Sequence, residues 1–316
     1  MARPAAKDAT TAAVIGTGLI GGAWATLFLA HGLDVRASDP SPQGEAHLRK
    51  IIERGWPVMT RLGLKPGADP GRVKFFKDPR EAVQGAHFVQ ENAPEKLDLK
   101  VEVLAELDAA MPPDIVLSSS TSGFLPSKLQ AKCKHPERVV VGHPFNPPYL
   151  VPLVEVVGGA KTAPWAVDWA ADFYARVGKR PLKLKREIEG FVANRLQAAI
   201  FKEAIHLAKL DVATIADIDA AVAAGPGLRW ALMGPFLTFH LARQGGIEDF
   251  IDLFVGEFNR YGLADGPMNV DRPAHAAMVE GTHAEAGGRS LDALSKTRDQ
   301  GLIELVEMLR TKDLPR

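Results

Sequence analysis

Short apolar runs alternate with longer stretches of helical periodicity over the first part of the chain. Runs typical of buried strands occur at 12–15, 33–38, 73–76, 87–90, 114–118, 139–141, 153–157 and 181–185. Helical spacing of apolar residues occurs between them, at 43–62, 95–111 and 164–177. This alternation predicts an α/β fold, in which helices cover both faces of a doubly wound, mostly parallel sheet.

The pattern changes near residue 190. Helical periodicity continues at 191–210, 215–222, 235–241, 247–258 and around 302–309, and no strand pattern occurs in this half. We therefore predict two domains, a sheet-containing domain over residues 1–188 and an all-helical domain over residues 189–316. A helical domain of this size can pack its own core and supply a dimer surface.

Three glycines lie where the strand predicted at 12–15 turns into a predicted helix that runs through Trp24 and Leu27 towards Gly32. They form the pattern Gly-x-Gly-x-x-Gly at Gly16, Gly18 and Gly21. Such a turn needs glycines because the backbone bends tightly and approaches a pyrophosphate without side chains in the way. The amino end of the helix offers free N–H groups to the same anion. We expect these glycines, with Leu19 and Ile20, to bind a dinucleotide cofactor.

An acidic residue stands where the second predicted strand ends. Asp39 follows Gly21 by 18 residues. A carboxylate there can accept hydrogen bonds from both ribose hydroxyls and would repel a 2′-phosphate. Together, the strand, the glycine turn, the helix and the acid predict a Rossmann-like domain that binds NAD rather than NADP.

The amino-acid composition argues against several classes of binding partner and indicates where in the cell the protein is located. Among 316 residues, 38 are Lys or Arg and 38 are Asp or Glu, so no basic excess indicates a nucleic acid or an anionic membrane as a partner. No apolar run is long enough to span a bilayer, and residues 1–11 contain no secretory h-region. Cys133 is the only cysteine and the histidines show no paired ligand spacing, so we expect a cytoplasmic protein without a metal.

Polar residues near three strand ends indicate acid–base chemistry. Ser122 follows one apolar run, His143 follows another, and Glu155 lies inside an apolar strand, where a carboxylate is costly unless it is paired. An imidazole oriented by a buried carboxylate can take a hydroxyl proton while hydride leaves the same carbon for nicotinamide. Taken separately, His143 is more typical of a structural histidine and Glu155 of a structural ion-pair residue.

These segments resemble the L-3-hydroxyacyl-CoA dehydrogenase family of NAD-dependent enzymes. The matching motifs are Ser122 in Ser-Thr-Ser-Gly, His143 in His-Pro-Phe-Asn-Pro, Glu155 in Leu-Val-Glu-Val-Val and Asn194 in Gly-Phe-Val-Ala-Asn-Arg. The resemblance implies that His143 is the general base, that Glu155 holds its imidazole, and that Ser122 and Asn194 hydrogen-bond the reacting oxygen. It also implies a site in the cleft between the domains.

A further segment resembles the part of that family that faces the cofactor. It covers residues 91–95 and includes Lys100 farther along the chain. The resemblance implies that Glu95, Lys100 and Ser122 contact NAD, and that the protein forms a homodimer through its helical domain.

The substrate prediction rests on where the chain departs from the acyl-CoA enzymes. Those of similar size commonly end in a Gly-Arg-Lys-x-Gly-x-Gly-Phe-Tyr-like segment, whereas this chain has Gly-Arg-Ser-Leu at 288–291. The region between Asp39 and Val73 is poor in the lysines that would bind the 3′-phosphate of CoA. Basic side chains do occur there at 49, 50, 54 and 61, so a CoA thioester remains an alternative substrate. Residues 225–236 resemble the subgroup that acts on small free hydroxy acids such as L-carnitine and L-gulonate.

The side chains in that segment suit carnitine. Arg229 can pair with a carboxylate through two hydrogen bonds, and Trp230 and Phe236 can form an aromatic wall for a trimethylammonium group. We expect Phe145, Arg229 and Trp230 to bind the substrate, although Arg229 could form a salt bridge and Trp230 could pack in a core. L-gulonate and 3-hydroxybutyryl-CoA are alternative substrates, and a crystallin-like or NADH-sensing protein is the non-enzyme alternative.

Overall fold

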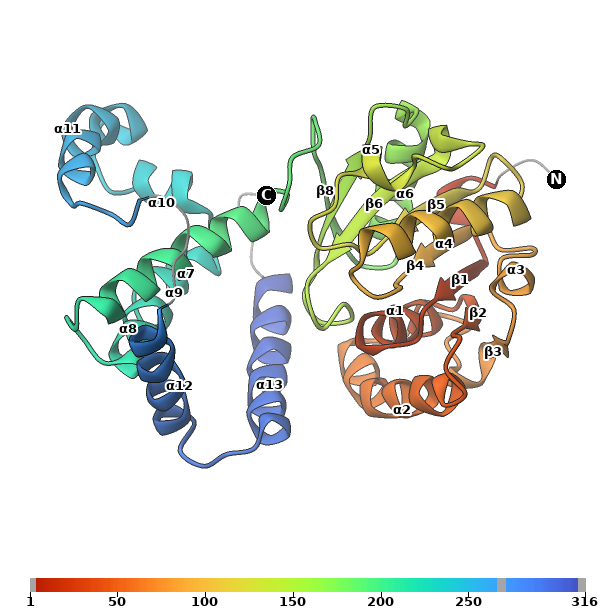
Figure 1. Ribbon diagram of the computed structural model, residues 1–316, viewed down its shortest axis with the longest axis horizontal. Coiled ribbons are helices and arrows are strands. Elements are labelled where there is room, and N and C mark those ends of the chain that lie inside the picture. Colours follow the sequence, from red (N-terminus) through yellow and green to blue (C-terminus); the bar gives the residue numbers. More distant parts are fainter. Residues whose placement is uncertain (1–3, 266–270, 312–316) are drawn as a thin grey trace. The chain divides into compact units, whose positions relative to one another are not determined.

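The computed structural model describes residues 4–265 and 271–311, and the chain divides after Asn194 into two compact units (Figure 1). The expected division after residue 188 falls in the segment that leads into the long helix α7 (Ala193–Lys209). Each unit is described by itself below.

An eight-stranded sheet forms the centre of the first unit, in the order β3-β2-β1-β4-β5-β6-β7-β8. All neighbouring strands are parallel except β6 and β7. The order reverses between β1 and β4, and a ligand binds at such a point beyond the carboxyl ends of the strands. The strands are β1 Thr11–Ile15, β2 Asp34–Ser38, β3 Val73–Phe76, β4 Phe88–Glu91, β5 Val116–Ser119, β6 Val139–Pro144, β7 Leu153–Gly158 and β8 Arg180–Lys183.

Helices cover both faces of this sheet, which confirms the predicted doubly wound fold (Figure 1). Successive strand residues point to opposite faces, so Ala12 and Val14 pack on α1, α2 and α6 while Ala13 and Ile15 pack on α3, α4 and α5. The helices are α1 Leu19–Ala30, α2 Gly44–Leu62, α3 Pro79–Ala82, α4 Leu97–Ala110, α5 Pro126–Leu129 and α6 Pro164–Arg176; short 3₁₀ turns are η1 Ala6–Asp8, η2 Pro70–Arg72 and η3 Pro136–Arg138.

The described residues of the second unit form helices joined by turns, without a strand, as the sequence predicts. Two helices were not anticipated, α9 and α12, because α9 is short and alanine and histidine leave α12 without a clear apolar stripe. The last helix begins earlier than predicted, because Ser290 caps it by accepting a hydrogen bond from the Ala293 N–H. Besides α7, the helices are α8 Ile215–Ala223, α9 Pro226–Trp230, α10 Pro235–His240, α11 Gly246–Arg260, α12 Arg272–Ala286 and α13 Leu291–Arg310.

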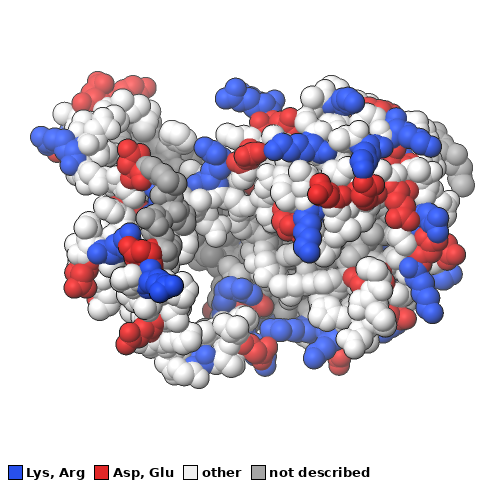
Figure 2. Space-filling view, in the orientation of Figure 1, with Lys and Arg blue, Asp and Glu red and all other residues white. Residues whose placement is uncertain are grey.

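The surface carries charges of both signs. Lysine and arginine side chains are interspersed with aspartate and glutamate over the face shown in Figure 2. Within the described parts of the chain, no helix is both long and apolar enough to cross a membrane. Cys133 is partly buried, and this burial raises the pKa of its thiol to about 12, so the thiolate is scarce at neutral pH.

One lysine is buried without a carboxylate beside it. The Lys179 ammonium group donates hydrogen bonds to the carbonyl oxygens of Pro148 (2.7 Å) and Val151 (2.5 Å) and lies 5.3 Å from the ring centroid of Trp24. Burial lowers the pKa of Lys179 to about 7. Lys179 therefore ties the loop between β6 and β7 to helix α1.

Lys179→Met should change how stability depends on pH. Between pH 7 and 10 the unfolded chain keeps the lysine proton and the folded chain loses it, so raising the pH stabilises the wild-type fold. We expect the free energy of unfolding of the wild type, relative to the variant, to rise by about 2–3 kcal/mol from pH 7 to pH 9. Urea unfolding followed by tryptophan fluorescence measures this difference. A constant difference across that range would show that Lys179 is charged in the folded state.

Candidate active site

The glycine turn is shaped by close backbone contacts. Gly16 has φ +87°, and a Cβ there would lie 2.6 Å from the Asn92 carbonyl oxygen. A Cβ at Gly21 would lie 1.8 Å from the Gly16 carbonyl oxygen, whereas a Cβ at Gly18 would meet nothing within 4 Å. Gly16 and Gly21 are thus required for the bend itself. The open space at Gly18 lets an anionic group approach the backbone.

The amino end of α1 suits that anion. The helix follows Gly18, which has no side chain to cap it, and its first turn begins with Leu19 and Ile20 and contains no acidic residue. The partial positive charge of the helix terminus is therefore not neutralised by the protein's own side chains. The residues present fit the pyrophosphate of a dinucleotide.

Asp39 lies directly after β2, beside the glycine turn. Its Oδ2 accepts a hydrogen bond from the Thr17 N–H (2.7 Å), and its Oδ1 accepts one from the Ser41 N–H (2.9 Å). Each carboxylate oxygen keeps a further lone pair. Asp39 is only partly buried, so these lone pairs can reach the hydroxyls of a ribose.

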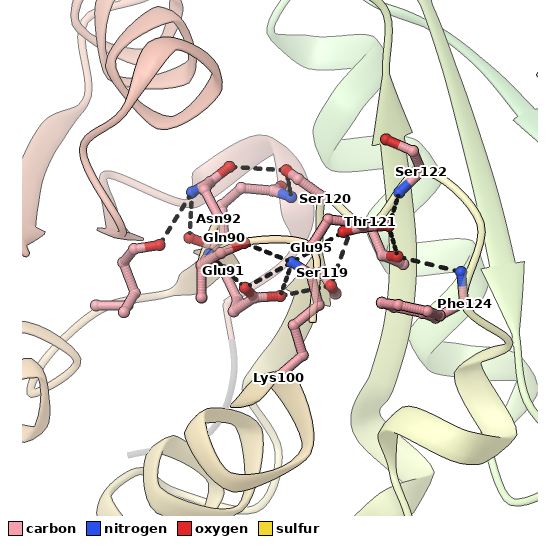
Figure 3. A network of polar contacts seen from close by, with 12 residues as sticks. Gln90, Glu91, Asn92, Glu95, Lys100, Ser119, Ser120, Thr121, Ser122 and Phe124 are labelled. Atoms are coloured by element: carbon pink, nitrogen blue, oxygen red, sulfur yellow. Dashed lines mark hydrogen bonds and ion pairs between the residues drawn. The ribbon is translucent and has the colours of Figure 1, made fainter. Parts of the chain in front are cut away.

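A buried ion pair lies beneath the segment after β4 (Figure 3). The Lys100 Nζ, from α4, lies 2.9 Å from Glu91 Oε1 and donates to the Ala93 carbonyl oxygen at 2.9 Å. Glu91 also accepts a hydrogen bond from the Ser119 hydroxyl at 2.5 Å. Lys100 and Glu91 have side chains only 1% and 0% exposed. The structure thus places Lys100 under this segment, with its ammonium group directed at protein oxygens.

Glu95 joins this ion pair to the loop after β5. Its Oε2 lies 3.6 Å from the Lys100 ammonium, and its Oε1 accepts hydrogen bonds from the Thr121 hydroxyl (2.6 Å) and the Ser122 N–H (2.8 Å). The backbone of Ser122 is thereby fixed (Figure 3). Ser122 itself is exposed, and its carbonyl oxygen accepts a hydrogen bond from the Asn194 side-chain amide at 2.8 Å.

His143 and Glu155 lie directly opposite each other on the antiparallel strands β6 and β7. Opposed residues of two strands share a face of the sheet, so the side chains meet. The His143 Nδ1 lies 2.9 Å from Glu155 Oε2, and the side chains are 5% and 0% exposed. This contact leaves the imidazole Nε2 for another partner.

The second oxygen of Glu155 binds the backbone that leads into α7. Its Oε1 accepts hydrogen bonds from the N–H groups of Val192 (2.8 Å) and Ala193 (3.0 Å). Burial acts to raise the pKa of Glu155, but the hydrogen bonds from His143 and from the two N–H groups outweigh it and hold the pKa below its ordinary value. Glu155 therefore stays ionised beside the imidazole.

Two aromatic rings flank the imidazole. The ring centroids of Phe145 and Phe191 lie 5.2 Å and 5.4 Å from that of His143. Phe191 is fully buried with φ +51°, an uncommon conformation for a bulky residue, and it comes just before the N–H groups that bind Glu155. The sequence motif around Asn194 included Phe191, but spacing alone did not assign it a role.

The structure brings Ser122, Asn194, His143 and Glu155 into the first unit with the glycine turn, Asp39, Glu95, Lys100 and Phe145. Arg229 and Trp230 lie on α9 of the second unit. Arg229 is exposed and Trp230 half-buried, and Arg229 forms no salt bridge to any other described residue. Among the residues that the structure describes, no cluster of three His, Cys, Asp or Glu side chains could hold a metal ion.

Comparisons with known proteins show similarity over both units of the chain. Residues 11–188 match the model for the NAD binding domain of 3-hydroxyacyl-CoA dehydrogenase, and residues 190–265 match the model for its C-terminal domain. An L-carnitine dehydrogenase from Streptomyces griseus is 49% identical over 313 residues, which is 99% of this chain and 93% of that protein. An L-carnitine dehydrogenase from Pseudomonas putida is 44% identical over 310 residues, which is 98% of this chain and 96% of that protein.

A solved structure is similar over its whole length. It is that of 5-formyl-3-hydroxy-2-methylpyridine 4-carboxylic acid 5-dehydrogenase, described as an NAD⁺-dependent dismutase. Its TM-score is 0.83 at 28% sequence identity, with 99% of this chain and 100% of that chain covered.

Replacing Glu155 should reveal how much stability its contacts provide. Glu155→Ala leaves the imidazole and two buried N–H groups without an acceptor, so we expect a loss of about 2–4 kcal/mol in the free energy of unfolding, measured by urea titration. Glu155→Gln keeps an oxygen for the two N–H groups and should lose about half as much. Equal losses in the two variants would contradict the assignment of those N–H groups to the carboxylate.

Proposed function

The chain belongs to the 3-hydroxyacyl-CoA dehydrogenase family, and we propose that it oxidises the 3-hydroxyl group of L-carnitine to give 3-dehydrocarnitine with NAD. The observation that carries the chemistry is the contact between His143 and the buried Glu155 carboxylate at 2.9 Å. The observation that favours carnitine is the identity of 43–49% to proteins of that activity over nearly the whole chain.

His143 is the proposed proton acceptor. Since Nδ1 is engaged by Glu155, Nε2 takes the proton of the substrate hydroxyl, and the carboxylate stabilises the imidazolium that forms. When bound, NAD supplies the acceptor for the hydride that leaves the carbon. Ser122 and Asn194 donate hydrogen bonds to the oxygen as it gains negative charge. Glu155 acts through His143 and is a positioning residue.

The cofactor would be held by residues from several loops of the first unit. The glycine turn and the start of α1 bind the pyrophosphate, and Asp39 binds the ribose. Lys100 lies beneath the segment after β4, where its buried ammonium group holds the Ala93 carbonyl oxygen and the Glu95 carboxylate in place. The residues proposed to hold NAD are Gly16, Gly18, Leu19, Ile20, Gly21, Asp39, Glu95, Lys100 and Ser122.

Recognition of carnitine is proposed to use both ends of the molecule. Arg229, which has no salt-bridge partner among the described residues, binds the carboxylate through its guanidinium group. Trp230 and Phe236 offer ring faces to the trimethylammonium group, an attraction worth about 0.5–2 kcal/mol. Phe145, beside His143, is a further proposed substrate contact.

The proposed assembly is a homodimer. Large apolar side chains are exposed on α7 and α11 of the helical unit, including Leu196, Phe201, Ile251 and Leu253 at 51–55% exposed. Exposed apolar side chains on neighbouring turns are typical of protein–protein interfaces, and a second copy of this chain is the proposed partner. We also propose a cytoplasmic location, because the lone Cys133 suits a reducing compartment.

His143→Gln should abolish most turnover without preventing cofactor binding. We expect kcat for L-carnitine to fall by about 10²–10⁴-fold, because the proton acceptor is lost. The Kd for NAD, measured by calorimetry, should change less than about twofold. An unchanged kcat across pH would remove His143 from the chemistry.

Arg229→Lys tests the substrate. A lysine keeps the charge but loses the paired hydrogen bonds, so KM for L-carnitine should rise about tenfold or more with a smaller change in kcat. The wild type is compared on L-carnitine, L-gulonate and 3-hydroxybutyryl-CoA. A kcat/KM for L-carnitine no higher than for the other two would overturn the substrate and leave the dehydrogenase class in place. Tight NADH binding without turnover of any of them would favour the non-enzyme alternative.

A further inference from the structure

The Asp39 carboxylate is held in place by the protein's own backbone. Both oxygens already accept backbone hydrogen bonds, from the Thr17 N–H at 2.7 Å and the Ser41 N–H at 2.9 Å. Neither of these bonds involves a ligand. The direction of the carboxylate is therefore set before a cofactor arrives.

Thr17 connects the glycine turn to helix α2. Its side chain is buried, with the residue only 1% exposed, and its hydroxyl donates a hydrogen bond to the Gly44 carbonyl oxygen at 3.0 Å. Gly44 is the first residue of α2. One residue therefore holds the Asp39 carboxylate through its backbone and the start of α2 through its side chain.

Gly44 closes the other side of Asp39. A Cβ at position 44 would lie 2.6 Å from the Asp39 Cβ and 3.1 Å from both its Cγ and its Oδ1. The Asp39 Cβ is next to the backbone, so it cannot move aside as the end of a long side chain could. Any larger residue at 44 must displace Asp39 or the start of α2.

We propose that Thr17 and Gly44 are the positioning residues that determine the preference for NAD over NADP, by preventing the Asp39 side chain from swinging away from the ribose. A fixed carboxylate accepts hydrogen bonds from the ribose hydroxyls of NAD, and its negative charge repels the 2′-phosphate of NADP. A carboxylate that can turn away loses the hydrogen bonds to the ribose hydroxyls, and it no longer repels the 2′-phosphate. The proposal rests on the proposed role of Asp39 at the ribose of NAD, and it does not depend on the identity of the substrate.

The test measures binding of NAD and NADP by isothermal titration calorimetry, without any substrate. Thr17→Val removes the hydroxyl donor and keeps the shape, whereas Thr17→Ser keeps the donor. We expect the Kd for NAD to rise about five- to tenfold in Thr17→Val and Gly44→Ala, with the Kd for NADP unchanged or lower. Thr17→Ser should retain the wild-type ratio of the two Kd values.

Gly256→Ala on α11 is the matched control for Gly44→Ala, because a Cβ at 256 meets nothing within 4 Å. It should leave both Kd values unchanged. The proposal is overturned if NAD and NADP weaken by the same factor in Thr17→Val, or if Thr17→Val and Thr17→Ser have the same ratio of Kd values. If Gly44→Ala fails to fold, the two Thr17 variants decide the question. A failure of L-carnitine oxidation would leave all of these binding results unaffected.

Discussion

A charged carboxylate enclosed by the protein is the constraint on which the candidate site depends. Glu155 is fully buried, so it must receive compensating hydrogen bonds or it would be protonated. One oxygen is bound by His143 and the other by two backbone N–H groups. The hydrogen bonds that keep Glu155 ionised therefore hold three features in place at once. These are the His143 imidazole, the pairing of β6 with β7 and the backbone that enters α7.

The segment that leads into α7 is also bound to α5 and to the loop after β5. Glu187 accepts hydrogen bonds from the Ser127 N–H and hydroxyl, Glu189 pairs with Lys128, and Asn194 donates to the Ser122 carbonyl oxygen. Residues 187–194 are therefore held against α5, the loop after β5 and, through Glu155, strand β7. Glu91, at the end of β4, is a second buried carboxylate. It receives its compensating contacts from the Lys100 ammonium group and the Ser119 hydroxyl.

The fold followed from the sequence because its signals are local. The apolar runs gave all eight strands to within a few residues, and the glycine turn with Asp39 indicated NAD, which the family match confirms. Family membership was also predicted correctly from the four motifs around Ser122, His143, Glu155 and Asn194. Their roles in catalysis stay predictions.

The features that could not be predicted from the sequence depend on contacts between residues that are far apart along the chain. The N–H groups of Val192 and Ala193 carry no sequence signature, so their bonds to Glu155 were not foreseen. Lys100 was expected to contact NAD, which stays a prediction, and no sequence pattern indicated that it is buried against Glu91. Helix α12 was missed because its residues lack the amphipathic period that prediction requires.

The antiparallel pairing of β7 limits how this protein can change. A shift of one residue in the pairing with β6 would turn Glu155 to the opposite face of the sheet and separate the acid from the base. Arg229 and Trp230 lie outside that restriction, on a different unit. Substitutions at the proposed substrate residues on α9 should therefore leave the pairing of acid with base unchanged, because that pairing is set by β6 and β7 alone.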